Sequence, residues 1–317
     1  MIPIVDTKNF VPAHRNHDLR QMASLPLDAK IRMSLERIRA WYEHWDGQVY
    51  VAFSGGKDST VLKHLVESLY PDTPSVFINT GLEYPELRRH ALAQKNVVRI
   101  DPTMRFDEVI ERYGWPVVSK EQASYVYEVR HTRSWKNYDA RMCDDSRENR
   151  FRLSKRWRYL LDAPFKISSE CCHVMKKAPA MRYEKETGRH PMLGVRALEG
   201  GPRARLWLRD GCNAFRLTRP HSWPIAFWTD QDVLEYLIRE KLGLPSVYGD
   251  IIRDEDGTLR TTKLARTGCI FCAFGAYAES SPNRFELLKQ SHPKQWDYVM
   301  NRLGMGAVLD YMGTPKG

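Results

Sequence analysis

Residues Ser54–Ser59, with the sequence SGGKDS, have the composition of an anion-binding loop. The loop follows the apolar segment Gln48–Phe53, which is typical of a buried strand, and precedes Thr60–Leu69, which is typical of a helix. Gly55 and Gly56 let the backbone approach an anion without a Cβ atom in the way. Because N–H groups at a helix start attract negative charge, this turn predicts a site for phosphate or a similar oxyanion.

The side chains of this loop add chemistry to its backbone. Ser54 and Ser59 supply hydroxyl donors, and Lys57 supplies a positive charge. Asp58 is unusual in an anion site and is explained as a Mg²⁺ ligand or as a cap of the helix. The spacing is not the GxxxxGK[ST] of nucleoside triphosphatases. A tight turn that binds nothing is the alternative.

Cysteine provides a second group of chemical residues. Cys269 and Cys272 form a C-x-x-C segment, whose spacing lets two sulfur atoms face one metal centre. Cys171 and Cys172 are adjacent, which strains a single tetrahedral ion but allows them to bind different irons of one cluster. In a reducing compartment, clustered cysteines indicate metal or redox ligands rather than disulfides. A 4Fe–4S cluster, a zinc ion and unliganded thiols are the alternatives.

Cys143 and Cys212 have no cysteine partner at ligand spacing, so a role as a small buried hydrophobic residue is expected for each. Cys143 could instead carry sulfur if it lies near the site. Lys176 and Lys177 follow the adjacent cysteines. They would offset the negative charge of thiolates and bind a substrate phosphate, or else form a solvated face.

Strand and helix patterns alternate around the loop. Strands are expected at 48–53, 75–79 and 97–100, and helices at 27–45, at 60–69 and from Pro85. The alternation predicts an α/β fold, a parallel sheet with helices on both faces. The lead-in up to Pro26 is expected to be irregular.

The remainder of the chain is expected to be mainly helical. A short strand is expected at Met192–Val195, a helix capped by Thr229 at Thr229–Lys241, a hairpin turn at Asp254–Gly257, and helices over 281–312. We expect an N-terminal arm and helix at 1–46, the domain with the loop at 47–200, and at 201–317 a mainly helical C-terminal extension that carries the C-x-x-C segment and packs on the domain.

Composition and charge narrow the class of protein. The 317 residues are 42% hydrophobic and 28% charged, which is the composition of a folded globular chain. No apolar stretch is long enough for a transmembrane helix and no signal peptide is evident, so we expect a cytoplasmic protein without a membrane partner. Lys and Arg number 49 against 39 Asp and Glu, and the net charge of +10 favours anionic partners or a merely solvated basic surface.

One stretch, Tyr125–Arg158, combines basic and aromatic side chains on expected helices. Such a surface could bind the backbone and bases of a nucleic acid, or it could be an exposed pair of helices with no ligand. The residues concerned are Arg130, Arg133, Trp135, Lys136, Arg141, Arg147, Arg150, Arg152, Lys155, Arg156 and Trp157.

The loop matches the S-G-G-x-D-S motif in full and thus resembles the PP-loop of the ATP pyrophosphatase superfamily. The resemblance implies an adenine nucleotide alpha hydrolase-like fold, in which the loop follows the first strand and holds the pyrophosphate of ATP or an equivalent group. It implies that ATP and Mg²⁺ are bound, and that Lys57 and Asp58 serve in catalysis.

Further segments are similar to the phosphoadenylyl-sulfate (PAPS) reductase branch of that superfamily. Asn79–Pro85 resembles its D-T-G-x-[EQ]-[FY]-P segment, with Asn79 in place of the usual Asp. Met192–Glu199 resembles a segment whose arginine reaches the phosphate or sulfate, and Trp223–Val233 also looks like this branch. The resemblance implies that the nucleotide is bound by Thr80, Gly81, Glu83 and Arg196, with Arg196 also catalytic.

The cysteine segments resemble those of assimilatory adenylyl-sulfate reductases and of the iron–sulfur enzymes of DNA phosphorothioation. This resemblance implies a 4Fe–4S cluster, with zinc as the alternative. The implied ligands are Cys171, Cys172, Cys269 and Cys272.

Sulfonucleotide reductases attack sulfur with a cysteine in an E-C-G-x-H tail, whereas no cysteine follows Cys272 here. We therefore expect an ATP pyrophosphatase of the sulfurtransferase type, which adenylates an acceptor, releases pyrophosphate and lets sulfur replace the activated oxygen. The alternatives are an adenylyl- or phosphoadenylyl-sulfate reductase with an external thiol, and a metal-stabilised, non-catalytic nucleic-acid-binding protein. The expected partners are an adenine nucleotide, a DNA or tRNA acceptor, a sulfur-donor protein such as a cysteine desulfurase, and as an option a second copy in a homodimer.

Overall fold

The computed structural model describes residues 14–143 and 151–317, and the chain divides into two compact units. Unit 1 comprises Met1–Ile78, Tyr84–Ile100 and Met181–Thr267, and unit 2 comprises Asn79–Glu83, Asp101–Ala180 and Gly268–Gly317. This division differs from the expected boundaries at residues 46 and 200. The physical reason is that residues 181–267 supply strands to the sheet of unit 1, while the C-x-x-C segment joins unit 2.

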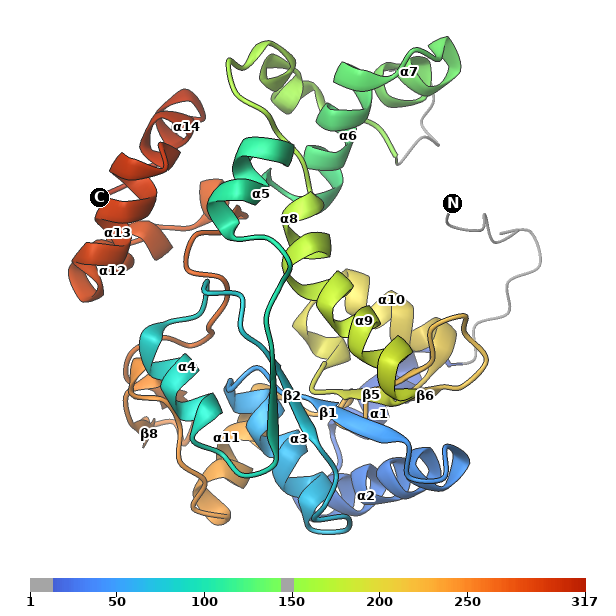
Figure 1. The fold of residues 1–317 in the computed structure, drawn as a ribbon. Helices are drawn as coiled ribbons and strands as arrows, with labels where there is room; N and C mark the ends of the chain where they lie inside the picture. Colours follow the sequence, from blue (N-terminus) through green and yellow to red (C-terminus); the bar gives the residue numbers. More distant parts are fainter. Residues whose placement is uncertain (1–13, 144–150) are drawn as a thin grey trace. The chain divides into compact units, whose positions relative to one another are not determined.

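A six-stranded sheet forms the centre of unit 1, with the strand order β3-β2-β1-β5-β7-β6 (Figure 1). Its strands are β1 (Val49–Ala52), β2 (Ser75–Ile78), β3 (Val97–Ile100), β5 (His190–Leu193), β6 (Asn213–Ala214) and β7 (His221–Ser222). Neighbouring strands are parallel except for β6 and β7, which are antiparallel. The expected hairpin is confirmed, since β8 (Ile251–Arg253) pairs antiparallel with β9 (Leu259–Thr261).

Side chains alternate along β1, so they point to both faces of the sheet. Helices cover both of these faces. Val49 and Val51 are fully buried in a core shared with α2, α3, α10 and α11, whereas Tyr50 packs with Val76 and Tyr183 in a separate cluster. The helices of unit 1 are α1 (Asn16–Ala23), α2 (Leu27–His44), α3 (Lys57–Glu67), α4 (Pro85–Leu92), the end of α9 (Ala178–Thr187), α10 (Gly201–Asp210) and α11 (Asp230–Arg239), with short 3-10 turns η4 (Ala197–Glu199) and η5 (Ser246–Tyr248). The predicted α/β fold is confirmed.

The prediction of an irregular lead-in up to Pro26 is wrong for α1. The helix starts where the carboxylate of Asp18 accepts a hydrogen bond from the N–H of Arg15 at 2.7 Å, which satisfies a donor that the first turn leaves free. Residues 1–13 of the expected arm lie outside the described part of the chain.

Unit 2 is mainly helical, and the helices expected over 281–312 are confirmed. Its two short strands, β4 (Val117–Val118) and β10 (Ala273–Phe274), pair in parallel. Its helices are α5 (Phe106–Tyr113), α6 (Lys120–His131), α7 (Trp135–Met142), α8 (Glu170–Cys172), the start of α9, α12 (Arg284–Ser291), α13 (Pro293–Asp297) and α14 (Met305–Tyr311). Short 3-10 helices occur at η2 (Lys155–Asp162) and η6 (Ala276–Ala278). Short π-helices occur at η3 (His173–Lys177) and η7 (Tyr298–Arg302).

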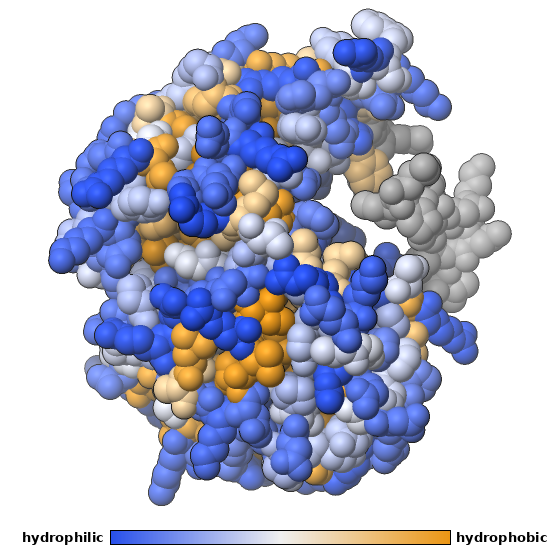
Figure 2. Space-filling model, in the orientation of Figure 1, coloured by the Kyte–Doolittle hydropathy of each residue, from blue (hydrophilic) through white to orange (hydrophobic). Residues whose placement is uncertain are grey.

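The surface is predominantly polar where Figure 2 displays it, and hydrophobic residues reach it in separate patches. Among the described helices, none combines the length and the apolar composition that crossing a membrane requires.

Candidate functional site

The SGGKDS loop connects β1 to α3 in unit 1, as the sequence predicts. Gly55 has a φ of +74°, and a Cβ atom there would lie 2.9 Å from the Cβ of Ala91, so glycine is required. The hydroxyls of Ser54 and Ser59 are 3.1 Å apart, and Ser59 also donates to the carbonyl of Gly56 at 2.9 Å. The turn is therefore fixed by its own hydrogen bonds.

A pocket of about 360 Å³ opens beside this loop within unit 1. Its volume falls in the range of roughly 300–1,000 Å³ that small-molecule sites occupy. Gly194 forms part of the lining, and a Cβ atom there would lie 3.0 Å from the carbonyl oxygen of Asp58, so the loop and the end of β5 approach closely. Loop residues line the pocket together with Glu199, Arg203, Tyr248, Arg266 and Thr267.

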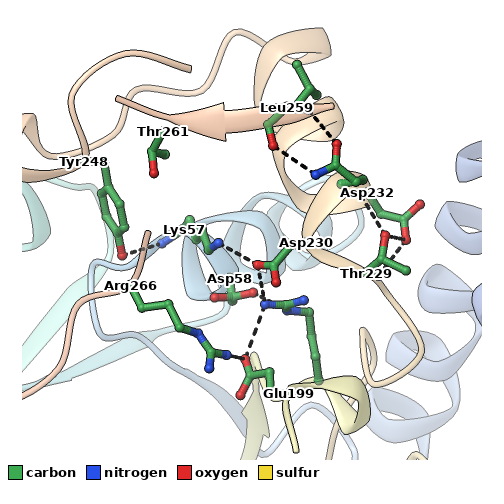
Figure 3. Close-up of polar contacts among 12 residues, drawn as sticks. Lys57, Asp58, Glu199, Thr229, Asp230, Asp232, Tyr248, Leu259, Thr261 and Arg266 are labelled. Atoms are coloured by element: carbon green, nitrogen blue, oxygen red, sulfur yellow. Dashed lines mark hydrogen bonds and ion pairs between the residues drawn. The ribbon is translucent and has the colours of Figure 1, made fainter. Parts of the chain in front are cut away.

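Ion pairs link the loop to α11 beside the pocket (Figure 3). The Nζ atom of Lys57 donates to Oδ1 of Asp230 at 2.6 Å, and Nη2 of Arg196 donates to the same oxygen at 2.8 Å. Burial alone would raise the pKa of Asp230, but the hydrogen bond from Lys57 and the charge of Arg196 outweigh it and hold that pKa below its ordinary value. Asp230 is thus an ionised partner of both cations.

Arg196 lies deeper than its predicted role suggests. The residue is 1% exposed and is not among those that line the pocket, whereas Lys57 does line it. Besides Asp230, Arg196 binds Oδ1 of Asp58 through Nε at 2.5 Å. The arrangement makes Arg196 a support for both carboxylates, and its contact with a nucleotide stays a prediction.

The start of α11 is held firmly, and the predicted cap at Thr229 is confirmed. The carboxylate of Asp232 accepts from the N–H of Thr229 at 2.6 Å, and the hydroxyl of Thr229 accepts from the N–H of Asp232 at 3.2 Å. Lys30 of α2, which is 2% exposed, also binds Asp232 at 2.6 Å. This capping box fixes the first turn of α11 and hence the position of Asp230.

Sequence reasoning missed several residues that line the pocket outside the SGGKDS loop. Arg266 binds Glu199 at 2.8 Å, and Glu199 also pairs with Arg203 (Figure 3 shows the first of these pairs). The hydroxyl of Tyr248 accepts from the N–H of Lys57 at 3.4 Å and lies 2.9 Å from the hydroxyl of Thr267. Burial raises the pKa of Tyr248, so this phenol stays protonated.

The predicted binding residues Thr80, Gly81 and Glu83 belong to unit 2 and are not among the residues that line the pocket. Within that unit the hydroxyl of Thr80 donates to Glu83 at 2.5 Å and accepts from the N–H of Leu82 at 3.1 Å. These bonds account for the turn itself, and the role of the segment in nucleotide binding stays a prediction.

The two cysteine pairs both belong to unit 2, although they are distant in the chain. Burial raises the pKa of Cys171, and the neighbouring thiols of Cys269, Cys172 and Cys272 raise it further. The thiol of Cys171 is therefore within electrostatic reach of the other three. Within residues 14–143 and 151–317, no group of three or more His, Cys, Asp or Glu side chains has the arrangement that would hold a metal ion. The metal centre stays a prediction.

Lys176 is the lysine that contacts this cysteine group. Desolvation opposes its charge, but the thiol of Cys269, to which it donates a hydrogen bond, and the carboxylate of Glu83 outweigh this and raise the pKa of Lys176. Both Lys176 and Lys177 are exposed residues. The two remaining cysteines differ, since Cys212 is buried and its Sγ accepts from Trp207 at 3.3 Å, as expected, whereas Cys143 is partly exposed.

Comparisons with known proteins agree with the predicted family. Residues 48–273 match the family described as the phosphoadenosine phosphosulfate reductase domain. The uncharacterized protein MJ0066 of Methanocaldococcus jannaschii is 26% identical over 281 residues, which are 87% of this chain and 46% of that protein, so the chain spans about half of its length. The phosphoadenosine 5'-phosphosulfate reductase of Alkalilimnicola ehrlichii is 25% identical over 237 residues, which are 74% of this chain and 75% of that protein.

A solved structure also resembles this chain. The crystal structure of phosphoadenylyl-sulfate reductase from Candida auris, a phosphate complex, has a TM-score of 0.41 and 15% identity. The likeness covers 76% of this chain and 94% of that one.

Proposed function

This chain belongs to the phosphoadenosine phosphosulfate reductase family, and from that premise we propose that it binds ATP at Ser54–Ser59 and activates an acceptor by adenylation. The observation that carries the proposal is the loop itself. Its turn is fixed by internal hydrogen bonds, and Lys57 and Ser59 line a pocket of about 360 Å³. Backbone N–H groups and a lysine at a helix start are the donors that phosphate groups require.

In the proposed reaction, an oxygen of the acceptor attacks the α-phosphorus of ATP, and the bond to the β-phosphate oxygen breaks. Pyrophosphate leaves, and its negative charge is stabilised by Lys57 and the loop N–H groups. The terminal sulfur of a persulfide on a donor protein, such as a cysteine desulfurase, then attacks the activated atom, and AMP leaves with the activated oxygen. A thiol reductant cleaves the remaining S–S bond to the donor, so that the sulfur stays on the acceptor and the donor cysteine leaves as a disulfide with that thiol. Asp58, a carboxylate in the pocket lining, would hold Mg²⁺, which shields phosphate charge.

We further propose that Cys171, Cys172, Cys269 and Cys272 bind a 4Fe–4S cluster. The chemistry of the donors supports this proposal, since unit 2 contains thiols from two segments and the adjacent pair suits a centre with several irons better than one tetrahedral ion such as zinc. Burial and like charge raise the pKa of Cys272 to about 11, and a bound cationic centre would offset that cost. When bound, such a cluster supplies redox chemistry or a position for sulfur.

Nucleic acid is the acceptor class that we propose. The side chain of Trp135 is 76% exposed on α7, and its ring stacks on that of Tyr138 with centroids 5.5 Å apart. Exposed aromatic rings beside Arg133 and Lys136 suit stacking on bases and pairing with phosphates. Arg147 and Arg150 of the predicted surface lie outside the described residues. The homodimer also stays a proposal.

Labelled nucleotides test the proposal. Anaerobic protein is incubated with ATP labelled in its β- and γ-phosphates, nucleic acid and a sulfur donor, and pyrophosphate release is measured. We expect release that falls at least about 100-fold in Lys57→Gln, since a lost charged contact removes transition-state stabilisation. Arg260→Gln is the control, because this exposed arginine lies on β9 and pairs with Asp254 at 2.8 Å outside the pocket lining.

A second candidate is an adenylyl- or phosphoadenylyl-sulfate reductase, which the similarity to the reductase of A. ehrlichii favours. Sulfite formed from labelled adenylyl sulfate or phosphoadenylyl sulfate with an added thiol, without pyrophosphate from ATP, would establish this candidate in place of adenylation. Nucleic-acid binding without turnover of any of these nucleotides, unchanged in Lys57→Gln, would indicate a non-catalytic binding protein.

A further inference from the structure

The pocket of unit 1 has a second basic wall, whose residues lie outside the SGGKDS loop. Three short segments build it, namely η4, the first turn of α10 and the residues that precede Gly268. They bring Glu199, Arg203 and Arg266 to the pocket lining. None of these residues comes from the SGGKDS motif, so this wall calls for a separate explanation.

Glu199 is shared among three guanidinium groups. Its Oε1 atom lies 2.8 Å from Nη2 of Arg266 and 3.6 Å from Nη2 of Arg196, and the carboxylate also pairs with Arg203. The side chain of Glu199 is 6% exposed, whereas those of Arg203 and Arg266 are 46% and 52% exposed. One carboxylate therefore serves two half-exposed arginines, and positive charge at this wall exceeds negative charge.

The surroundings of Arg203 disfavour its positive charge. Burial lowers the pKa of this guanidinium, and the like charges of Arg266 and Arg196 lower it further. An anion placed between the two half-exposed arginines would relieve that repulsion. A guanidinium presents five N–H donors in a planar fork, so both arginines have donors beyond those that one carboxylate can engage.

We propose that Arg203 and Arg266 form a second anion subsite, which binds a phosphate group of the nucleotide at a point separate from the one held by the loop. The inference rests on the proposed nucleotide-binding function of the same pocket. The ligand class is an adenine nucleotide with an additional phosphate, either in a longer 5′ chain, as in ATP, or on the 3′ oxygen, as in phosphoadenylyl sulfate. Glu199 is the positioning residue that holds the two arginines in place.

Isothermal titration calorimetry tests the subsite with AMP, ATP, adenylyl sulfate and phosphoadenylyl sulfate as ligands. The proteins compared are the unsubstituted chain, the pocket variants Arg203→Gln and Arg266→Gln, and the control Arg260→Gln. The side chain of Arg260 is 53% exposed and lies outside the pocket lining. We expect each pocket variant to lose about 10- to 100-fold in affinity for the ligand with the additional phosphate, because charge-assisted hydrogen bonds are lost. Affinity for AMP should change less than about twofold, and Arg260→Gln should match the full chain.

The pattern of losses identifies the phosphate. If the variants lose affinity for ATP, adenylyl sulfate and phosphoadenylyl sulfate to a similar degree, the subsite binds the 5′ chain. If they lose affinity for phosphoadenylyl sulfate alone, the subsite binds the 3′ phosphate. Equal losses for all ligands including AMP, or no loss for any, would overturn the subsite. If the full chain binds none of the four ligands, the proposed function itself fails, and this outcome is distinct from a subsite failure. Thermal unfolding of each variant confirms that it is folded.

Discussion

The pocket of unit 1 and the cysteine group of unit 2 differ in whether their charged groups have partners of opposite charge. In the pocket, Lys57 and Arg196 share Asp230, and the arginines of the second wall share Glu199. In the cysteine group, neighbouring thiols raise the pKa of Cys171, and Lys176 adds one positive charge next to Cys269. In the pocket each of these cations has a carboxylate partner, although the cations outnumber the two shared carboxylates, whereas thiolates in unit 2 would repel one another.

This difference separates two kinds of preorganisation. A pocket whose cations already have partners keeps its shape without a ligand, and in the proposed function a nucleotide would exchange one set of ion pairs for another. A group of thiols in which ionisation is unfavourable gains stability when a cationic centre binds, so metal binding and folding are coupled. We therefore expect the stability of unit 2 to depend on metal and that of unit 1 to be independent of it.

Removal of metal should give the largest effect. We expect an anaerobic chelator to raise amide hydrogen exchange by roughly a thousandfold around α8 and β10, while β1 and α3 stay protected, because the metal's binding energy is folding energy for unit 2. Hydrogen exchange read by mass spectrometry measures this. Cys269→Ser should purify without iron and exchange like the chelated protein, and Cys143→Ser should keep its iron.

An equal rise in exchange in both units on chelation would contradict the comparison, since the pocket would then share the metal dependence of the cysteine group. Unchanged exchange in protein shown to have lost its iron would equally argue against it.

Substitution of Gly55 should give an intermediate effect. Gly55→Ala places a residue at φ +74° with its Cβ atom 2.9 Å from that of Ala91, so both strain and overlap are expected. Gly188→Ala is the matched control, because Gly188 has φ +69° and nothing within 4 Å of the added Cβ atom. We expect a loss of unfolding free energy of about 1–2 kcal/mol for Gly188→Ala and about 2–4 kcal/mol for Gly55→Ala, measured by urea unfolding.

Nucleotide affinity separates these two variants further. Gly55→Ala should lose binding because the loop shifts, whereas Gly188→Ala should bind normally. Equal unfolding free energies with normal binding in both variants would show that the loop is adaptable rather than preformed.

Titration of Asp230 should give the smallest effect. Its pKa in the folded chain lies below the ordinary value of 3.8, so the stability that its ionised form contributes is complete above about pH 5 and fades as the pH falls through the lowered value. Asp230→Asn cannot titrate. Because the side chain is 56% exposed, we expect the variant to be less stable by a few tenths to about 1 kcal/mol at neutral pH.

The stability gap between the chain and Asp230→Asn should close as the pH falls below about 4, which urea unfolding over a pH series can follow. A gap that stays constant down to about pH 3 would mean that Asp230 contributes through packing and not through its charge.

The loop could be predicted because its chemistry and its local structure lie in the same short segment. The serines, glycines and Lys57 that are predicted to bind an anion also form the turn. The cap at Thr229 was predictable for the same reason, since a capping box spans four successive positions. Local patterns of this kind do not depend on the rest of the fold.

The second wall of the pocket could not be predicted because distant segments build it. Nothing in the spacing of Glu199 and Arg266 shows that they meet, and Tyr248 looks like an ordinary core residue until its hydroxyl is found against the N–H of Lys57. The division into units was missed for a related reason. The strands β6 and β7 have two residues each, too few for an alternating pattern to be visible, yet they place the segment that contains them in the main sheet.

The buried pair between Lys30 and Asp232 has a practical consequence. Because Asp232 caps the helix that presents Asp230, the second helix of the chain helps to align Lys57 and Arg196, which follow Lys30 by 27 and 166 positions. A shortened version made for inhibitor screening would therefore have to begin before α2. A protein trimmed to start at β1 would keep the whole signature motif and still offer a misaligned target.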